Sequence, residues 1–426
     1  MWAIWPTAAG ETGCRSEVGL AGALDLAAKI AQVTSVTQLP DAFTLLQITP
    51  ALDTGGVEQT TLDMARAVTE AGGRALVASR GGRLEDELAR RGGELVRMDM
   101  ATKNPLTMLL NARRLRSLIR DEGVSLVHIR SRAPAFAALS AARAEGVPVV
   151  TTYHGVYNAR SALKRWYNGV MVRGDFTIAN SDFTRAHVLA THAVDPARVR
   201  SIPRGVDLAR FDPDAVPEAR VRALRARWGL SADETRTVFL LAGRLTRWKG
   251  QELVIRALGA ARMAGGPEMI LVLAGDDQGR HDYTASLRAL AELEGVGEAV
   301  RIIGHCADMP AAYLAADFAL SPSLEPEAFG RTAVEPQAMG RPVLAAAHGG
   351  TAETVVDGET GWLVAPGSLT EWASGLTTAA LSPPETRARM GAAGRARARQ
   401  LYGLDVMCDA TLDVYARVLA GRAGAT

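Results

Sequence analysis

The chain has 426 residues, of which 48% are hydrophobic and 22% charged, and its mean hydropathy is +0.03. This composition is typical of a globular protein long enough for two domains, and it excludes a polytopic membrane protein. The 48 basic and 46 acidic residues leave a net charge of only +2, which gives no reason to expect a nucleic-acid partner. The three cysteines are widely spaced, which argues for a reducing, cytoplasmic location and against a zinc site or a disulfide framework.

The first half of the chain predicts one domain that follows an N-terminal extension. Residues 1–40 carry no motif and form the expected extension, whereas residues 41–210 alternate between strand and helix patterns. Apolar runs predict strands at 43–49, 74–78, 125–129, 147–152 and 176–179. Helical spacing predicts helices at 106–121 and 134–145. Such alternation indicates a parallel sheet covered on both faces.

A second alternation predicts another domain over residues 211–400. Its start is marked by the proline-containing linker 211–217, and apolar runs predict strands at 237–242, 269–274, 300–303, 318–320, 342–345 and 361–364. Residues 401–426 contain a helical pattern from about 405 to 420. The expected fold class is therefore α/β, with two Rossmann-like, doubly wound domains and a ligand between the carboxyl ends of their strands.

The segment 322–342 carries the most informative pattern, because two acids, Glu327 and Glu335, flank a predicted helix start. Gly330 permits close approach of the backbone, and the free N–H groups at a helix start attract anions. Acids on both sides of such a helix end suit a ligand that carries phosphate and hydroxyl groups, as a nucleotide sugar does. Two surface acids flanking a helix are the alternative interpretation.

This spacing resembles the Glu-x7-Glu signature of retaining glycosyltransferases of family 4, which have the GT-B fold. The resemblance implies that Glu327 binds the sugar hydroxyls and Glu335 the ribose hydroxyls. It also places the segment Phe329, Gly330, Arg331 and Thr332 beside the donor, and implies that the C-terminal helix crosses back to the first domain. Pro336 departs from the alanine that is usual in the family, and proline is tolerated in the first turn of a helix. We therefore expect this helix to begin one or two residues later than usual.

The loop 243–250 follows the first strand of the second domain and contains Arg244 and Lys249. Exposed loop charges would be the ordinary interpretation, but the two residues match the family's phosphate-binding arginine and lysine. The resemblance therefore implies that both stabilise the leaving diphosphate, and that no metal or other cofactor is needed. No metal-ligand spacing is evident, since Asp212 and Asp214 lie in the linker.

Further positions match the family around the donor. Gly55 and Gly56 open the first helix of the first domain, without the third glycine of a nicotinamide fingerprint. His154 ends a predicted strand and matches a histidine of the donor-sugar pocket, where hydrogen bonding is more plausible than proton abstraction. Gly304 and His305 lie where the family contacts the nucleobase.

No side-chain pattern in the sequence identifies the acceptor. We expect the acceptor to bind near Glu58, Tyr157 and Asn158. Arg204 stands where the family more often has asparagine, in the segment between the domains. Glu353 is expected to be either a helix cap or a supporting acid.

The predicted function is that of a retaining glycosyltransferase, a hexosyltransferase-type enzyme of bacterial cell-envelope or exopolysaccharide synthesis. It would move a sugar from a nucleotide-diphosphate sugar to a glycan or lipid-linked acceptor. The alternatives are a sugar-nucleotide epimerase of the same architecture, and a scaffold whose catalytic site has decayed. Basic residues cluster at 113–120 and 160–165. The favoured interpretation is that they form solvated helix faces, and the other is peripheral contact with the inner face of the plasma membrane.

Overall fold

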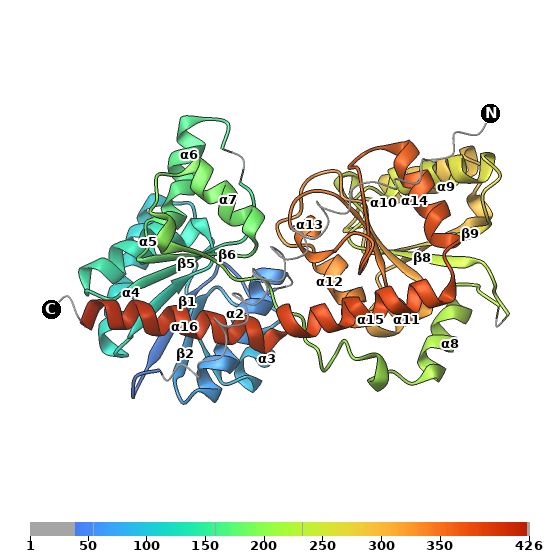
Figure 1. The fold of residues 1–426 in the computed structure, drawn as a ribbon. Coiled ribbons are helices and arrows are strands. Elements are labelled where there is room, and N and C mark those ends of the chain that lie inside the picture. The colour runs from blue at the N-terminus through green and yellow to red at the C-terminus, as the bar shows by residue number, and fades with distance from the viewer. Residues whose placement is uncertain (1–38, 54, 158, 232, 424–426) are drawn as a thin grey trace, which may run out of the picture.

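The computed structural model describes residues 39–53, 55–157, 159–231 and 233–423, and it contains two parallel β-sheets covered by helices (Figure 1). The expected extension at residues 1–40 falls almost wholly outside the described residues. We refer to the part built on the first sheet as the N-terminal domain and to the part built on the second as the C-terminal domain.

The N-terminal domain contains a seven-stranded sheet of order β3-β2-β1-β4-β5-β6-β7, with all neighbours parallel. Its strands are β1 (Thr44–Ile48), β2 (Arg74–Ser79), β3 (Gly93–Arg97), β4 (Leu126–Ile129), β5 (Val149–Tyr153), β6 (Phe176–Ala179) and β7 (Val199–Ser201). The apolar runs of the sequence did not predict β3 and β7. Both are edge strands that lack the continuous apolar run of a strand buried on both faces.

Helices cover both faces of this sheet. They are α2 (Gly56–Glu70), α3 (Glu85–Arg90), α4 (Pro105–Asp121), α5 (Arg132–Ala144), α6 (Ala162–Asn168) and α7 (Asp182–Thr191). One core layer lies between the sheet and α4 with α5, and the other lies between the sheet and α2, α3 and the C-terminal helix. Asn104 shows how the local sequence sets a boundary: its side chain caps α4 and proline occupies the first turn.

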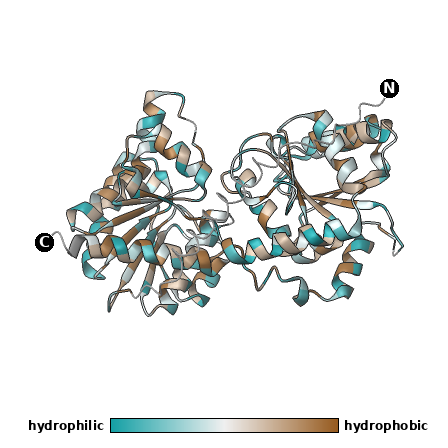
Figure 2. Cartoon of the chain, in the orientation of Figure 1, coloured by the Kyte–Doolittle hydropathy of each residue, from teal (hydrophilic) through white to brown (hydrophobic). Residues whose placement is uncertain are grey.

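The C-terminal domain contains a six-stranded parallel sheet of order β10-β9-β8-β11-β12-β13. Its strands are β8 (Thr237–Ala242), β9 (Met269–Ala274), β10 (Val300–Gly304), β11 (Phe318–Ser321), β12 (Val343–Ala346) and β13 (Gly361–Val364). Its helices are α8 (Glu218–Arg227), α9 (Gln251–Met263), α10 (His281–Leu293), α11 (Met309–Ala315), α12 (Arg331–Ala338), α13 (Thr351–Thr354), α14 (Leu369–Ala380) and α15 (Pro384–Leu401). Figure 2 shows the apolar strands inside both domains and polar residues on the outer faces of the helices.

The chain crosses between the domains twice, near Val206 and near Gly403, and hydrogen bonds join the two crossing segments. Val206 and Gly403 form an isolated parallel bridge, with hydrogen bonds from Val206 N to Tyr402 O (2.7 Å) and from Leu404 N to Val206 O (3.0 Å). A Cβ on Gly205 would lie 2.6 Å from Leu404 Cα, so glycine is needed for this approach. After the bridge, α16 (Leu404–Ala423) runs along the N-terminal domain and packs on α2 (Figure 1).

The predicted fold class, α/β with two doubly wound domains and a returning C-terminal helix, is confirmed. In the described residues, no helix combines the length and apolarity that crossing a membrane would need.

Candidate functional site

A buried ion pair lies at the carboxyl end of the second sheet. Lys249 Nζ donates to Glu327 Oε1 at 2.7 Å, and each side chain is only 11% exposed. Ser323 Oγ donates to the same carboxylate oxygen at 2.5 Å. Glu327 Oε2 has no hydrogen-bond partner among the described residues. The structure thus brings together two predicted residues 78 positions apart and leaves one carboxylate oxygen able to accept.

Two glycines, Gly330 and Gly350, allow the close packing that holds the loop carrying Glu327 in place. Gly330 has φ +89°, caps α12, and would place a Cβ 2.7 Å from Thr351 Cγ2. Gly350 N donates to Glu327 O at 2.7 Å, and a Cβ on Gly350 would meet Phe329 Cα at 2.5 Å. Phe329 itself is buried against Tyr402, so only its main chain can face a ligand. Gly330 is therefore required by its left-handed backbone and by Thr351, independently of any ligand.

The prediction that Pro336 delays the start of α12 is wrong. The helix begins at Arg331, and Pro336 is its sixth residue. Proline removes an N–H that would otherwise bond four residues back, a cost that packing offsets because residues 333–338 are all buried.

Glu335 is more fully engaged than Glu327. Its two oxygens accept from Tyr313 Oη (3.1 Å) and from Arg331 Nη2 (2.7 Å). Burial, followed by the neighbouring carboxylate, raises the pKa of Tyr313 well above its usual range, so the phenol remains a donor. Thr332 Oγ1 lies 3.5 Å from Ser321 Oγ, which ties the first turn of α12 to β11.

The other predicted residues of the C-terminal domain, Arg244, Gly304 and His305, form no hydrogen bond with the ion pair in the described residues. The Arg244 side chain is exposed and forms no ion pair or hydrogen bond within the described chain, whereas its main-chain oxygen accepts from Gln251 Nε2 at 3.0 Å. Gly304 ends β10 with φ +68° and open space beside it, and His305 follows at an exposed position.

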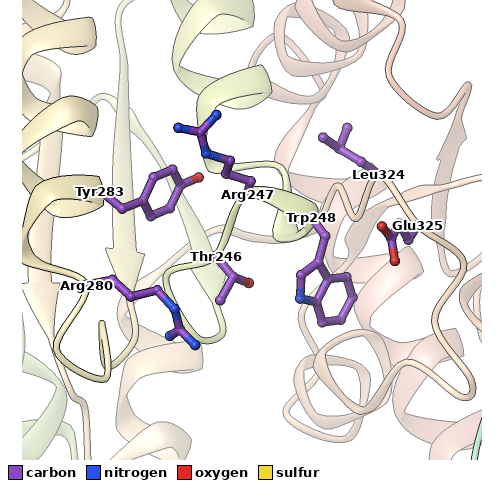
Figure 3. A pocket seen from close by; sticks show the side chains of 7 residues that line it. All are labelled: Thr246, Arg247, Trp248, Arg280, Tyr283, Leu324 and Glu325. Atoms are coloured by element: carbon purple, nitrogen blue, oxygen red, sulfur yellow. The ribbon is translucent and has the colours of Figure 1, made fainter.

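A pocket of about 880 Å³, part of it open solvent, lies on the same loops. Its lining residues are Thr246, Arg247, Trp248, Arg280, Tyr283, Leu324 and Glu325. Figure 3 shows Arg280 and Tyr283 on one side of the Thr246–Trp248 turn and Leu324 with Glu325 on the other. None of the predicted site residues lines it, although Trp248 packs under the Lys249 ammonium, 4.4 Å from the ring centroid.

The start of α2 contributes from the N-terminal domain. Gly55 is the N-cap and makes no side-chain cap, so the first N–H groups of the helix lack that partner. A Cβ on Gly56 would lie 1.8 Å from Arg204 Nη1, and one on Gly55 would lie 2.4 Å from Glu58 Oε2. The glycine pair therefore makes room for the Arg204 guanidinium and the Glu58 carboxylate.

Arg204 was noted in the sequence only as a departure from the family, and the structure places it beside His154. Arg204 Nη2 lies 3.1 Å from His154 Nδ1. Burial, followed by the charges of Arg331 and Arg130, lowers the pKa of Arg204 to about 10. Burial, followed by Arg204 and Arg130, holds the pKa of His154 well below its usual range. Cations of both domains thus converge here.

The predicted acceptor-side residues have different surroundings. Tyr157 packs against Tyr153 (4.5 Å between ring centroids), and the Arg132 guanidinium lies 3.8 Å from the Tyr157 ring centroid. Burial raises the pKa of Tyr157. Asn158 lies outside the described residues. In the described ranges, no group of three or more histidine, cysteine or acidic side chains is arranged to hold a metal.

Glu353 joins the two domains. Its Oε2 accepts from Asp182 N at 3.0 Å, and its Oε1 accepts from Phe183 N, at the start of α7. Ala328 O accepts from Thr184 Oγ1 at 3.4 Å in the same region. Of the two roles expected for Glu353, the structure shows the helix cap, made across the domain interface.

Comparison with known proteins agrees with this architecture. Residues 54–210 match the family described as "Glycosyltransferase Family 4", and residues 224–397 match the family described as "Glycosyl transferases group 1". The chain is 37% identical to the D-inositol 3-phosphate glycosyltransferase of Actinosynnema mirum over 239 residues, 54% of each chain. It is 33% identical to the Salinispora tropica protein of that name over 293 residues, 65% of this chain and 60% of the relative.

The aligned regions thus span only about half to two thirds of these relatives. Solved structures cover more: a glycosyltransferase from Rickettsia africae ESF-5 has a TM-score of 0.83 at 29% identity, over 89% of this chain and 99% of that one. Anabaena HepE in complex with UDP and glucose has a TM-score of 0.75 at 23% identity, over 87% and 99% of the two chains. The chain belongs to the glycosyltransferases of group 1 and family 4, as both matched halves and the shared fold show.

Proposed function

We propose that this protein is a retaining glycosyltransferase that moves a sugar from a nucleotide-diphosphate sugar to a hydroxyl group of an acceptor. The observation that carries the proposal is the buried Lys249–Glu327 pair beside the start of α12. It combines an ammonium group, a free carboxylate oxygen and helix N–H groups. These are the groups that a phosphate and sugar hydroxyls need.

In the proposed reaction, the bond between the sugar C1 and the diphosphate oxygen breaks, and a bond from C1 to the acceptor oxygen forms on the same face. The acceptor proton passes to the departing phosphate oxygen. Lys249, Arg244 and the first N–H groups of α12 stabilise the negative charge that develops, which is the largest catalytic task. Glu327 positions the sugar through its free oxygen, and no step requires a metal.

The names of the relatives suggest substrates to test first. HepE has been solved with UDP-glucose, so a UDP-sugar is the first donor. The curated relatives are D-inositol 3-phosphate glycosyltransferases, so a phosphorylated polyol is one acceptor to test. WaaG, a structural neighbour, is described as involved in lipopolysaccharide biosynthesis, which supports testing glycan and lipid-linked acceptors.

Peripheral contact with an anionic membrane surface is part of this proposal. Leu163 and Trp166 of α6 are 74% and 54% exposed, and Lys164 and Arg165 lie between them in sequence. Exposed apolar side chains next to cations are typical of interfacial membrane contacts.

The test is a transfer assay with UDP-sugars, with and without acceptor, on the parent protein and Glu327→Gln. We expect the variant to lose transfer by about 100-fold or more while nucleoside diphosphate still binds, because the amide removes the charge but keeps the shape. Glu359→Gln, an exposed acid of the same domain, is the control. Unchanged turnover in Glu327→Gln would remove its assigned role, and donor interconversion without acceptor would indicate an epimerase.

A further inference from the structure

Two basic side chains share a hydrogen bond in the N-terminal domain. Arg204 Nη2 lies 3.1 Å from His154 Nδ1. A guanidinium group has only donors and keeps its proton, so Nδ1 must be the acceptor. The proton of the neutral imidazole is then carried by Nε2.

The other ring nitrogen is enclosed without a partner. His154 Nε2 is shielded from solvent and forms no hydrogen bond with any described residue. The main chain at this position is fixed, because His154 O accepts from Asn180 Nδ2 at 3.2 Å. An enclosed N–H without an acceptor is costly, so this atom is a place where a ligand oxygen would be stabilising.

Arg204 and Arg130 disfavour a positive charge on the ring, which also has His128 and Tyr157 among its neighbours. Arg204 approaches from the segment before the Val206 crossing, Arg130 from the end of β4, and His128 from β4 itself. Tyr157 lies on the following loop. No carboxylate within the described residues bonds to His154. The ring is therefore kept neutral, and only its orientation and tautomer remain to be set.

We propose that Arg204 is a positioning residue that locks His154 in the neutral Nε2–H tautomer, so that His154 donates a hydrogen bond to a ligand oxygen. That this ligand is a nucleotide sugar rests on the proposed function. An asparagine amide at this position could both donate and accept, and so would not fix the tautomer. In this chain, His154 acts as a hydrogen-bond donor and not as a base.

Gly56 belongs to the same arrangement. A Cβ at this position would lie 1.8 Å from Arg204 Nη1, so a side chain at the first residue of α2 would displace the guanidinium from its place beside His154. Because φ of Gly56 is not in the left-handed region, backbone strain does not explain this glycine.

The experiment measures histidine ring-nitrogen NMR shifts of the ¹⁵N-labelled, unliganded full chain, with His154→Gln used to assign the signals. In the parent protein, we expect Nδ1 without a proton and Nε2 with one, unchanged from about pH 5 to 8. In Arg204→Met, His154 should exchange between tautomers or titrate. Arg204→Lys should restore the parent pattern, and Arg143→Met, an arginine on α5 without contact to a histidine, should not change it.

A proton on Nδ1 in the parent protein would overturn the proposal, and so would a parent-like spectrum in Arg204→Met. If Arg204→Met does not fold, the parent spectrum and Arg204→Lys still decide. The NMR experiment uses no substrate, so it is independent of the transfer assay. If the protein shows no transferase activity, the tautomer result still stands. If the tautomer prediction is wrong, the proposed transferase activity is not affected.

Discussion

The two domains bring opposite kinds of charge arrangement to their interface. In the C-terminal domain, Lys249 and Glu327 neutralise each other, and Ser323 completes the cluster. In the N-terminal domain, Arg204 donates to a neutral histidine and has no ion pair among the described carboxylates. In the first cluster the ion pair is already formed and one carboxylate oxygen is still able to accept, whereas in the second the ring N–H of His154 is a donor that still needs an acceptor.

This difference indicates that the two clusters have different roles. A preassembled ion pair costs little reorganisation when charge develops, which suits stabilisation of a leaving group. A cluster of unsatisfied donors gains most when a ligand arrives, which suits recognition and closure. The Glu353 cap on α7 links the two domains that carry these clusters.

The largest effect should come from breaking the C-terminal pair. Lys249→Met leaves the Glu327 carboxylate buried without its cation, and we expect a loss of about 3–5 kcal/mol in the free energy of unfolding of that domain. Nucleoside diphosphate affinity should fall by about 10- to 150-fold. Urea denaturation and calorimetric titration measure the two effects. Lys249→Arg, which keeps the charge, is the control, and equal affinity in Lys249→Met and parent would exclude Lys249 from the phosphate site.

An intermediate effect should follow from changing the glycine that holds the same loop. Gly330→Ala adds left-handed strain of about 1–2 kcal/mol and a methyl group that meets Thr351 Cγ2 at 2.7 Å, for a further 1–3 kcal/mol or so. Gly265→Ala is the matched control, since Gly265 also has positive φ (+74°) but nothing near its Cβ. Both free energies of unfolding come from urea denaturation. Equal losses in the free energy of unfolding of the two variants would mean that the loop around Gly330 adjusts to the added methyl group without cost, and that the loop is not rigid.

The smallest effect concerns the neutral histidines of the N-terminal domain. His128 is buried and bonds to Tyr415 Oη (2.6 Å) and Thr152 Oγ1 (2.7 Å), and burial holds its pKa well below the usual range. Below pH 6.5 or so, the unfolded chain takes up a proton that the folded ring does not, so stability should fall by up to about 1.4 kcal/mol per pH unit.

Urea denaturation between pH about 7.5 and 5.5 measures this slope, and His128→Gln should reduce it by one histidine's share even if the variant is less stable. An identical slope in parent and variant would show that His128 is protonated in the folded state.

Much of the fold was predictable because buried parallel strands are nearly continuous apolar runs. The strands β1, β8, β9 and β13 lie where their hydrophobic patterns place them. The outer strands β3 and β7 could not be found in this way, because an edge strand is partly exposed and draws its stability from one neighbour. The start of α12 was also misjudged, because the packing around Pro336 offsets the cost of a proline beyond the first turn of a helix.

The sequence by itself determined the α/β alternation, the family and the spacing of Glu327 and Glu335, because all of these are local patterns along the chain. Only the tertiary structure decided that Lys249 pairs with Glu327, that Glu353 caps a helix of the other domain, and that Arg204 meets His154. These partners are 78, 171 and 50 residues apart. No local preference encodes which distant charges meet when two sheets and a shared helix bring their loops together.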